Sequence, residues 1–274
     1  MVSRHYLPMH AWTAGLLFLL VLLRPAYGKE GAAKESPSVA SMVEVPAGTH
    51  RPLFVQPGET NSLQVPAFQL DRHPVTNGEY LDFVTRNPKW RRSQVKRIFA
   101  DENYLRHWAG DLEPGEAAAA QQPVTWVSWF AAKAYAQWQG KRMPTVTEWE
   151  YAASHGFSAL GGSKDPEFQA AIRRWYSTPS PASLPLVAQG RANVLGLHDL
   201  HGLVWEWTSD FNSSLVTGDA RGDSGIERQL FCGAGSAGNR NPSDYPAFLR
   251  YGFRSSLKAS YCIHNLGFRC AADL

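Results

Sequence analysis

The amino-acid sequence predicts an α+β fold with few helices and much irregular structure. Patterns typical of helices, each with its own start signal, occur only between residues 76 and 153. After Ser154 the chain is rich in Gly and aromatic residues, which favours loops and short strands. The 274 residues include Gly 23 and Pro 18, as expected for many turns. With 44% hydrophobic residues the chain can bury a large core, and we expect one domain over residues 41–274.

Two strands and a helix are expected at the start of this domain. Residues 42–48 favour a strand that ends in a turn, and residues 65–72 alternate apolar and polar side chains, as a second strand would. Thr76 and Glu79 have the spacing of a capping box, so a helix is predicted to begin at Thr76. Its apolar face ends before Pro88, which cannot continue a helix.

Two more helices are predicted in the middle of the chain. Ser128 opens a helix over residues 129–139, and Gly140 suits the position just after its end. Residues 145–148 form a second capping box that opens a short helix carrying Trp149.

The segment between the first and second helices, residues 89–120, has a weaker pattern. Tyr104, His107 and Trp108 are predicted to form a buried insert. The segment also holds a basic cluster made of Lys89, Arg91, Arg92, Lys96 and Arg97. No matching charge excess exists elsewhere in the chain, so we interpret the cluster as a solvated face.

The first 28 residues have the features of a secretory signal peptide. Arg4 precedes an apolar run over residues 11–23, which is too short to span a bilayer comfortably, and residues 26–28 offer small side chains at the cleavage positions. Arg24, just after the run, leaves an uncleaved anchor as an alternative. We expect cleavage, a flexible leader over residues 29–40, a periplasmic or secreted protein and no membrane contact afterwards.

Charge excludes some partners. The formal net charge of +3 becomes +1 when Arg4 and Arg24 leave with the signal. Nothing in this charge indicates binding to nucleic acid or to an anionic membrane surface.

Residues 196–210 (GLHDLHGLVWEWTSD) have the pattern that the rest of the chain is organised around. The carboxylates of Asp199 and Glu206 and the carbonyls of Gly202 and Val204 can face one cation. This set contains only oxygen, which suits calcium better than a transition metal. The alternative is that the two acids cap turns or pair with arginines while the neighbouring tryptophans fill the core.

This stretch resembles the signature of the formylglycine-generating enzyme (sulfatase-modifying factor) family. Four other colinear blocks share the resemblance, at residues 71–80, 123–129, 140–153 and 265–271. The resemblance implies a C-type-lectin-like α+β fold. It also implies that Asp199, Gly202, Val204 and Glu206 fall on one of the calcium sites of the family. The segment matching the other calcium site, residues 177–189, lacks its acidic residue, so that site is not predicted.

Copper chemistry is not expected on the same resemblance. The oxidases of the family hold Cu(I) with two cysteines, and soft thiolates are the right ligands for that ion. Here the matching positions are Asn239 and residues 241–244, which contain no cysteine. Oxidation of a sulfatase cysteine is therefore not expected, and whether the chain is an enzyme stays open.

Three cysteines are available, Cys232, Cys262 and Cys270. In an exported protein they predict one disulfide and one free thiol, with the pairing open. The resemblance implies that Cys270 lies on a buried strand and stays free. A transition-metal site is an alternative, built from Cys232, Cys262, His198, His201 and His264.

A ligand cleft is predicted in the last part of the chain. The resemblance places residues 250–258 on an Arg-rich strand behind the active cleft, with Ser236, Asn239 and Asp244 nearby. Arg250 and Arg254 can bind an anionic ligand, since guanidinium groups suit carboxylates. They can equally pair with Asp244 or Glu206.

Two functions remain in view. The chain most resembles the branch of nitrite reductase accessory proteins of denitrifying bacteria, which assist a periplasmic copper enzyme. This implies an exported, calcium-stabilised accessory or maturation protein with a periplasmic redox enzyme as partner. The alternative is an oxidoreductase with a different active site, as in the pyoverdine-maturation branch of the same superfamily.

Overall fold

A computed structural model describes residues 42–53, 62–212 and 245–274. The predicted signal peptide and leader lie outside these residues, as do Cys232, Ser236, Asn239 and Asp244. The strands are β1 Met42–Val45, β2 Gly48–His50, β3 Leu63–Val65, β4 Phe68–Asp71, β5 Trp205–Trp207, β6 Leu266–Phe268 and β7 Ala271–Asp273. The helices are α1 Asn77–Arg86, α2 Trp129–Trp138, α3 Val146–Ala153, α4 Pro166–Ser177 and α7 Tyr245–Ser255, with 3-10 turns at Pro88–Trp90, Glu116–Ala118 and Gly162–Lys164.

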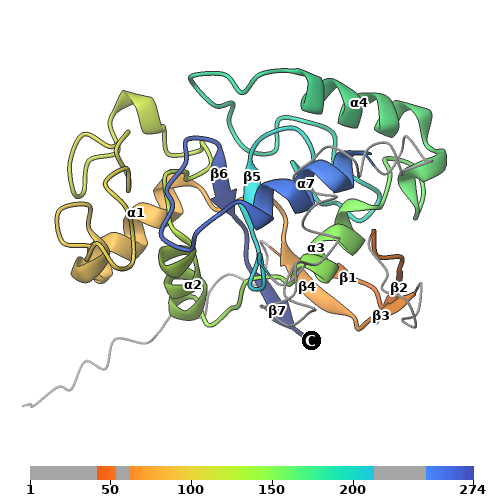
Figure 1. Cartoon of the computed structure of the whole chain (residues 1–274), viewed down its shortest axis with the longest axis horizontal. Coiled ribbons are helices and arrows are strands. Elements are labelled where there is room, and N and C mark those ends of the chain that lie inside the picture. The colour runs from red at the N-terminus through yellow and green to blue at the C-terminus, as the bar shows by residue number, and fades with distance from the viewer. Residues whose placement is uncertain (1–41, 54–61, 213–244) are drawn as a thin grey trace, which may run out of the picture. The chain divides into compact units, whose positions relative to one another are not determined.

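Three small sheets position the rest of the domain (Figure 1). Strand β4 lies between β1 and β7 and is antiparallel to both, so the last strand of the chain pairs with the start of the domain. Strands β2 and β3 form an antiparallel pair. Strands β5 and β6 are parallel, with Glu206 opposite Gly267 and Trp207 opposite Phe268. The β5–β6 pair therefore joins two of the sequence blocks singled out above.

The predicted helix starts are confirmed. Thr76 and Thr145 both complete capping boxes, in which each threonine side chain accepts a backbone N–H while Glu79 or Glu148 accepts from the cap residue. Ser128 caps α2, and that helix ends at Trp138, one residue before the predicted end. Short-range hydrogen bonds decide these positions, which is why the sequence alone locates them.

The expectation that helices are confined to the first half is wrong, because α4 and α7 form in the second half. Helix α4 begins with Asp165, which accepts from the N–H of Phe168, followed by Pro166 at the first helical position. Residues 250–258, predicted as a strand, lie largely in α7. The side chains of Arg250 and Arg254, four residues apart, are both buried on one face, which is a helical spacing.

The largest hydrophobic cluster joins α1, α2, the 89–120 segment and β6. Tyr80 and Phe83 of α1 contact Tyr135 of α2, and Tyr80 also lies against Trp108. Trp108 is 1% exposed and its indole N–H donates to Asn77, so the prediction of a buried insert is confirmed for this residue. Edge-to-face and offset ring contacts of this kind add to the energy of burial.

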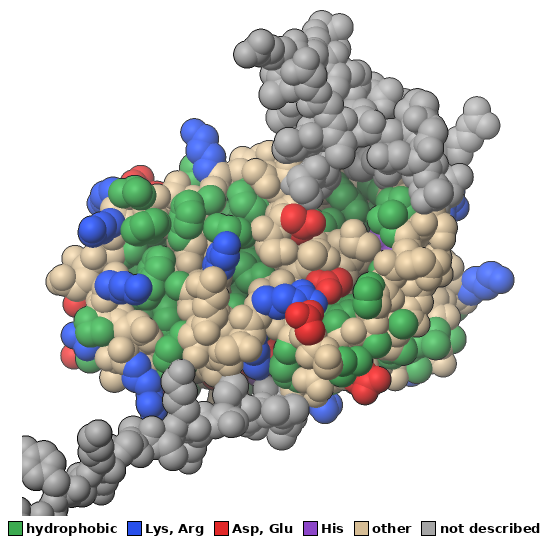
Figure 2. All heavy atoms as spheres, turned by 90° about the horizontal axis from the view of Figure 1, so that it is seen from below, with side chains coloured by type: hydrophobic (Ala, Val, Ile, Leu, Met, Phe, Trp, Pro, Cys, Tyr) green, Lys and Arg blue, Asp and Glu red, His purple; other side chains and the backbone are tan. Residues whose placement is uncertain are grey.

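The basic cluster is only partly a solvated face. Arg91 donates to the carbonyls of Val84 and Thr85 near the end of α1, and Arg92 donates to the carbonyl of Trp108. Figure 2 shows Lys and Arg side chains separated by hydrophobic and other side chains on the face in view. Among the residues that the structure describes, no helix is long and apolar enough to cross a membrane.

Gly267 in β6 leaves no room for a side chain, which gives a test of the β5–β6 junction. An added Cβ would lie 2.7 Å from the carbonyl oxygen of Val124. We expect Gly267→Ala to lower the free energy of unfolding by about 1–3 kcal/mol, measured by urea denaturation. The control is Gly252→Ala in α7, where the Cβ meets nothing within 4 Å. That change should stabilise by about 0.5–1 kcal/mol, and equal effects would contradict the packing described.

Candidate functional site: two buried ion clusters and an aromatic pocket

The Glu206 carboxylate is buried and pairs with Arg269. Both side chains are 0% exposed, and Arg269 donates through Nε and Nη2 to the two carboxylate oxygens at 2.8 Å. Paired donors of this kind form strong, directional interactions with a carboxylate. Arg269 Nη1 donates to the carbonyls of Asp71, at 3.1 Å, and Arg72, at 3.4 Å, and Nη2 also donates to that of His198, at 2.9 Å. One guanidinium thus connects β4, β5 and the loop before β5.

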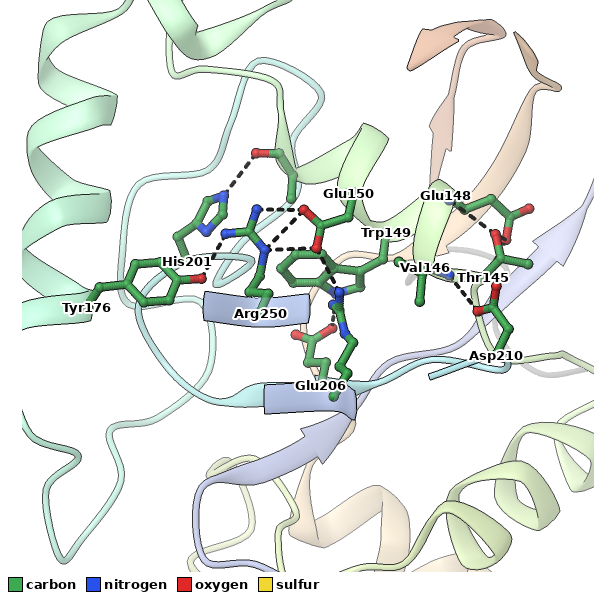
Figure 3. A network of polar contacts seen from close by, with 12 residues as sticks. Thr145, Val146, Glu148, Trp149, Glu150, Tyr176, His201, Glu206, Asp210 and Arg250 are labelled. Carbon is green, nitrogen blue, oxygen red and sulfur yellow. Dashed lines mark hydrogen bonds and ion pairs between the residues drawn. The ribbon is translucent and has the colours of Figure 1, made fainter. Parts of the chain in front are cut away.

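Trp149 of α3 connects this pair to a second ion cluster. Its indole N–H donates to Glu206 at 2.7 Å, and its ring faces the guanidinium groups of Arg250 and Arg254 at 5.3 and 4.7 Å. Guanidinium groups bind favourably over an indole face. The neighbouring residue, Glu150, accepts hydrogen bonds from both arginines. Figure 3 shows Trp149 between Glu206 and the Glu150–Arg250 pair.

The Glu150 carboxylate stays ionised in this cluster. Burial raises its pKa, but the charges and hydrogen bonds of Arg250 and Arg254 outweigh burial and hold the pKa at about 2. Arg250 also donates to the Tyr176 hydroxyl at 2.8 Å. The cluster therefore fixes α7 against α3 and orients a residue near the end of α4.

An aromatic pocket lies beside the Arg250 cluster. It has a volume of about 530 Å³ and receives residues from α4, β5 and α7, together with Thr178 and Ser180. The Trp205 ring lines the pocket, 4.4 Å from the Phe253 ring and 5.4 Å from the Trp175 ring. The lining residues include hydroxyl groups but no charged side chain. Such a wall suits an apolar or aromatic group of a ligand.

The predicted calcium residues lie around one loop. Asp199 and Gly202 have positive φ values of 60° and 130°, and Asp199 accepts from the N–H of Ala188 at 2.6 Å. Burial raises the Asp199 pKa, and the charge of Glu206 contributes in the same direction. The calcium site remains a prediction, and the predicted alternative, pairing with an arginine, is what Glu206 does with Arg269.

The fit of calcium to this loop rests on Asp199. Both Glu206 oxygens already accept from Arg269, and one of them also accepts from Trp149. No group of three or more His, Cys, Asp or Glu suited to a metal occurs among the residues described. A calcium ion here would need Asp199 and the backbone carbonyls of Gly202 and Val204, with Glu206 shared between the ion and Arg269.

The structure describes only two of the five residues predicted to form the ligand cleft. Arg250 and Arg254 are 7% and 2% exposed, and both pair with Glu150 rather than facing an open cleft. Ser236, Asn239 and Asp244 lie outside the described residues. Glu150 belongs to the block at residues 140–153, but its role was missed. Its partners are about a hundred positions away in the sequence, and no local pattern indicates them.

Two of the three cysteines are free thiols in the core. Cys262 and Cys270 are unpaired and buried, at 2% and 0% exposed. The prediction that Cys270 is buried and free is confirmed, but the residue lies between β6 and β7 rather than on a strand. The predicted disulfide is wrong, because two free thiols leave Cys232 without a partner among the three cysteines. Burial raises the pKa of both thiols, so each is held as the neutral thiol rather than the thiolate. Neither lines the aromatic pocket.

The sequence places the chain in a known family. A model of the sulfatase-modifying factor enzyme 1-like domain matches residues 29–274, and the chain belongs to this family. It is 28% identical to the formylglycine-generating enzyme of Mus musculus, over 86% of this chain and 76% of that one. It is 29% identical to the inactive C-alpha-formylglycine-generating enzyme 2 of Bos taurus, over 85% of this chain and 88% of that one.

A longer relative contains a similar region. The serine/threonine-protein kinase Pkn1 of Chlamydia trachomatis is 30% identical over 78% of this chain. The match spans only about a third of that kinase, 34% of its length. The resemblance therefore concerns one part of a larger protein.

Breaking the Glu206–Arg269 pair is expected to destabilise the fold strongly. Arg269→Met leaves a buried carboxylate without its cation and should lower the free energy of unfolding by about 3–5 kcal/mol in urea denaturation. The control is Arg191→Met, because Arg191 pairs with Glu167 on the surface, where both side chains are more than half exposed. A surface pair contributes about 1 kcal/mol or less. Similar losses in the two variants would disprove the central role given to Arg269.

Glu150 predicts a particular dependence of stability on acid. Its folded pKa of about 2 is below the ordinary value of 4.5, so its contribution is complete above pH 4.5. That contribution is lost as the pH falls from 4.5 to about 2. The pKa of His201 is lowered from 6.5 to about 3. Below pH 6.5 the unfolded state therefore binds a proton that the folded state does not, and the free energy of unfolding falls. In Glu150→Gln, a plot of the urea midpoint against pH should become flatter below pH 4.5 and keep its slope above that pH. An unchanged slope below pH 4.5 would contradict the lowered pKa of Glu150.

Proposed function

We propose that this chain is an exported accessory protein on the sulfatase-modifying factor scaffold, which binds an apolar or aromatic group of its partner in the aromatic pocket. The observation that carries the proposal is the uncharged wall around Trp205, held in shape by the buried Glu150 cluster. A rigid aromatic pocket provides affinity without requiring a reacting group.

Loss of the copper pair supports a binding role. A Cu(I) site of the family type needs two neighbouring thiolates. The chain has three cysteines, and Cys262 and Cys270 are buried as free thiols in the core. Cys232 alone cannot supply a pair. A relative in cattle carries the description inactive, so the scaffold also occurs in a protein named as lacking the activity.

Calcium is proposed to stabilise the loop of the Asp199 carboxylate and the carbonyls of Gly202 and Val204. The positive φ values at Asp199 and Gly202 mark turns in the loop that carries these oxygens. We also propose that the fold is C-type-lectin-like, because the family resemblance implies it.

A periplasmic copper nitrite reductase is the partner we propose, after export and removal of residues 1–28. The support is the resemblance to the nitrite reductase accessory branch and the sequence features of a signal peptide. The competing function is an oxidoreductase of the pyoverdine-maturation type. It requires turnover at the pocket, and it is favoured by the 34% identity of part of this chain to the hercynine oxygenase of Mycobacterium tuberculosis.

The mature protein should bind a nitrite reductase encoded beside it in the same genome. Trp205→Ala removes a ring that contacts three other aromatic rings of the pocket wall. This change is expected to weaken the binding at least tenfold in calorimetry, a loss of about 1.4 kcal/mol. The control is Ile98→Ala, an exposed apolar side chain far along the chain from the pocket. Equal binding by both variants, or oxygen uptake with a cysteine-containing sulfatase peptide, would contradict the proposal.

Calcium should raise the unfolding midpoint of the mature protein. At a hundredfold excess over its dissociation constant the ion adds about 2.7 kcal/mol, since it binds only the folded chain. Asp199→Ala should abolish the response, whereas Asp111→Ala, which removes an exposed carboxylate bonded to Ser93, should preserve it. A wild-type protein whose midpoint ignores calcium would refute this part of the proposal.

A further inference from the structure

Leu105 and Trp126 adopt an unusual backbone conformation next to each other. Their φ values are 47° and 56°, in the left-handed region that bulky side chains rarely occupy. The N–H of Leu105 donates to the carbonyl of Trp126 at 2.8 Å, and the N–H of Trp126 donates to that of Ile263 at 3.0 Å. Such strain persists only where the surrounding structure enforces it, and it is concentrated at functional sites. This pair of residues is therefore a candidate for a function outside the sites described above.

The residue after Leu105, Arg106, lies against the Trp126 ring. Its guanidinium carbon is 5.1 Å from the ring centroid, which is a cation–π contact. Arg106 Nη1 also donates to Oδ1 of Asn103 at 2.9 Å, so a second contact orients the guanidinium. Arg106 is exposed and Trp126 is only partly buried, so a partner can reach both. The strained backbone thus presents an oriented guanidinium at the surface.

Arg106 has no carboxylate partner among residues 42–53, 62–212 and 245–274. The two acids nearest to it in the sequence have other contacts. Asp101 accepts from the N–H of Asn103 at 2.9 Å, and Glu102 pairs with Arg97 at 3.8 Å. A guanidinium has five N–H donors, and Asn103 accepts from one of them. The remaining donors suit a carboxylate supplied from outside the chain.

This site adjoins the aromatic pocket through one short segment. The carbonyl of Ile263 accepts from Trp126, and two residues later the carbonyl of Asn265 accepts from the N–H of Trp205 at 2.8 Å. The Asn265 side chain donates at 2.9 Å to Ser180, which lines the pocket. An extended peptide advances about 3.3 Å per residue. A partner segment that places a side chain in the pocket can therefore reach Arg106 with a residue close to it in sequence.

We infer that Arg106, oriented by Trp126, binds a carboxylate of the partner segment whose aromatic side chain occupies the pocket. This inference rests on the function proposed for the pocket and specifies the partner further, as a segment with an aromatic and an acidic residue. The aromatic side chain supplies buried apolar contact, and the carboxylate adds a charged contact that selects among aromatic segments.

Blocked peptides with one tryptophan and one aspartate, separated by one to four glycines, are the probe. Replacing the aspartate by asparagine removes the charge and keeps the shape. The mature chain with ¹⁵N-labelled tryptophan is titrated while the indole N–H resonances of Trp126 and Trp205 are followed. At the best spacing the aspartate peptide should bind about tenfold more tightly and shift both resonances. Equal affinities at every spacing, with a shift at Trp205 alone, would overturn the inference and leave the pocket proposal standing.

Arg106→Gln should remove the preference for aspartate. The affinity for the aspartate peptide should fall about tenfold, the affinity for the asparagine peptide should stay the same, and the dependence on salt should weaken. The control is Arg191→Gln, which removes the same charge from a surface pair with Glu167 and should keep the preference. A preference that persists in Arg106→Gln would overturn the inference.

Trp126→Asn tests whether the ring orients Arg106. Asparagine tolerates the left-handed backbone, so this change removes the ring and keeps the turn. The preference for aspartate should decrease, and Arg106→Gln should have a smaller effect in this background. Circular dichroism and the urea midpoint establish that each variant is folded. A full preference in Trp126→Asn would contradict the role of the ring. An aspartate preference that survives Trp205→Ala would disprove the link to the pocket, and no saturable binding of any peptide would refute both proposals.

Discussion

The pairing of Glu206 with Arg269 is the interaction on which the rest of the described domain depends. Both side chains are fully buried, and separating them would leave an uncompensated charge in the core. Arg269 also donates to the backbone of Asp71 and His198. Strand β5 can therefore lie beside β6 only where the loop before β5 and the end of β4 are already in place. The charge pair acts as a geometric constraint more than as a source of net stability.

Trp149 transmits this constraint to the aromatic pocket. Its N–H is fixed by Glu206, and its ring supports Arg250 and Arg254. These arginines fix α7 through Glu150, and Arg250 orients Tyr176 on α4. The pocket walls come from β5, α4 and α7. Each of these elements is hydrogen-bonded within the same buried cluster, so the walls are held in fixed positions relative to one another. A pocket organised in this way loses little entropy when it binds a rigid group.

The sequence patterns located the features that are decided by interactions between neighbouring residues. They missed the features that depend on contacts between distant parts of the chain. Capping at Thr76 and Thr145 needs partners three residues away, and both helices start where predicted. The partner of Arg250 is Glu150, a hundred positions earlier, so the sequence suggested Asp244 or Glu206 instead. The same limit explains why α7 was predicted as a strand. Its two arginines can be buried on a helix face only because Glu150, far away in the sequence, pairs with them.

The residues that stabilise the fold and the positions that match the copper cysteines lie in different parts of the sequence. The residues that hold the domain together, Glu206, Arg269, Trp149 and Glu150, lie in the sequence blocks that carry the family resemblance. The positions matching the copper cysteines are Asn239 and residues 241–244, outside those blocks, where no cysteine occurs. The residues of the buried ion pairs lie elsewhere in the sequence. A family member can thus lose oxygen chemistry while it keeps its fold and an aromatic wall built around Trp205.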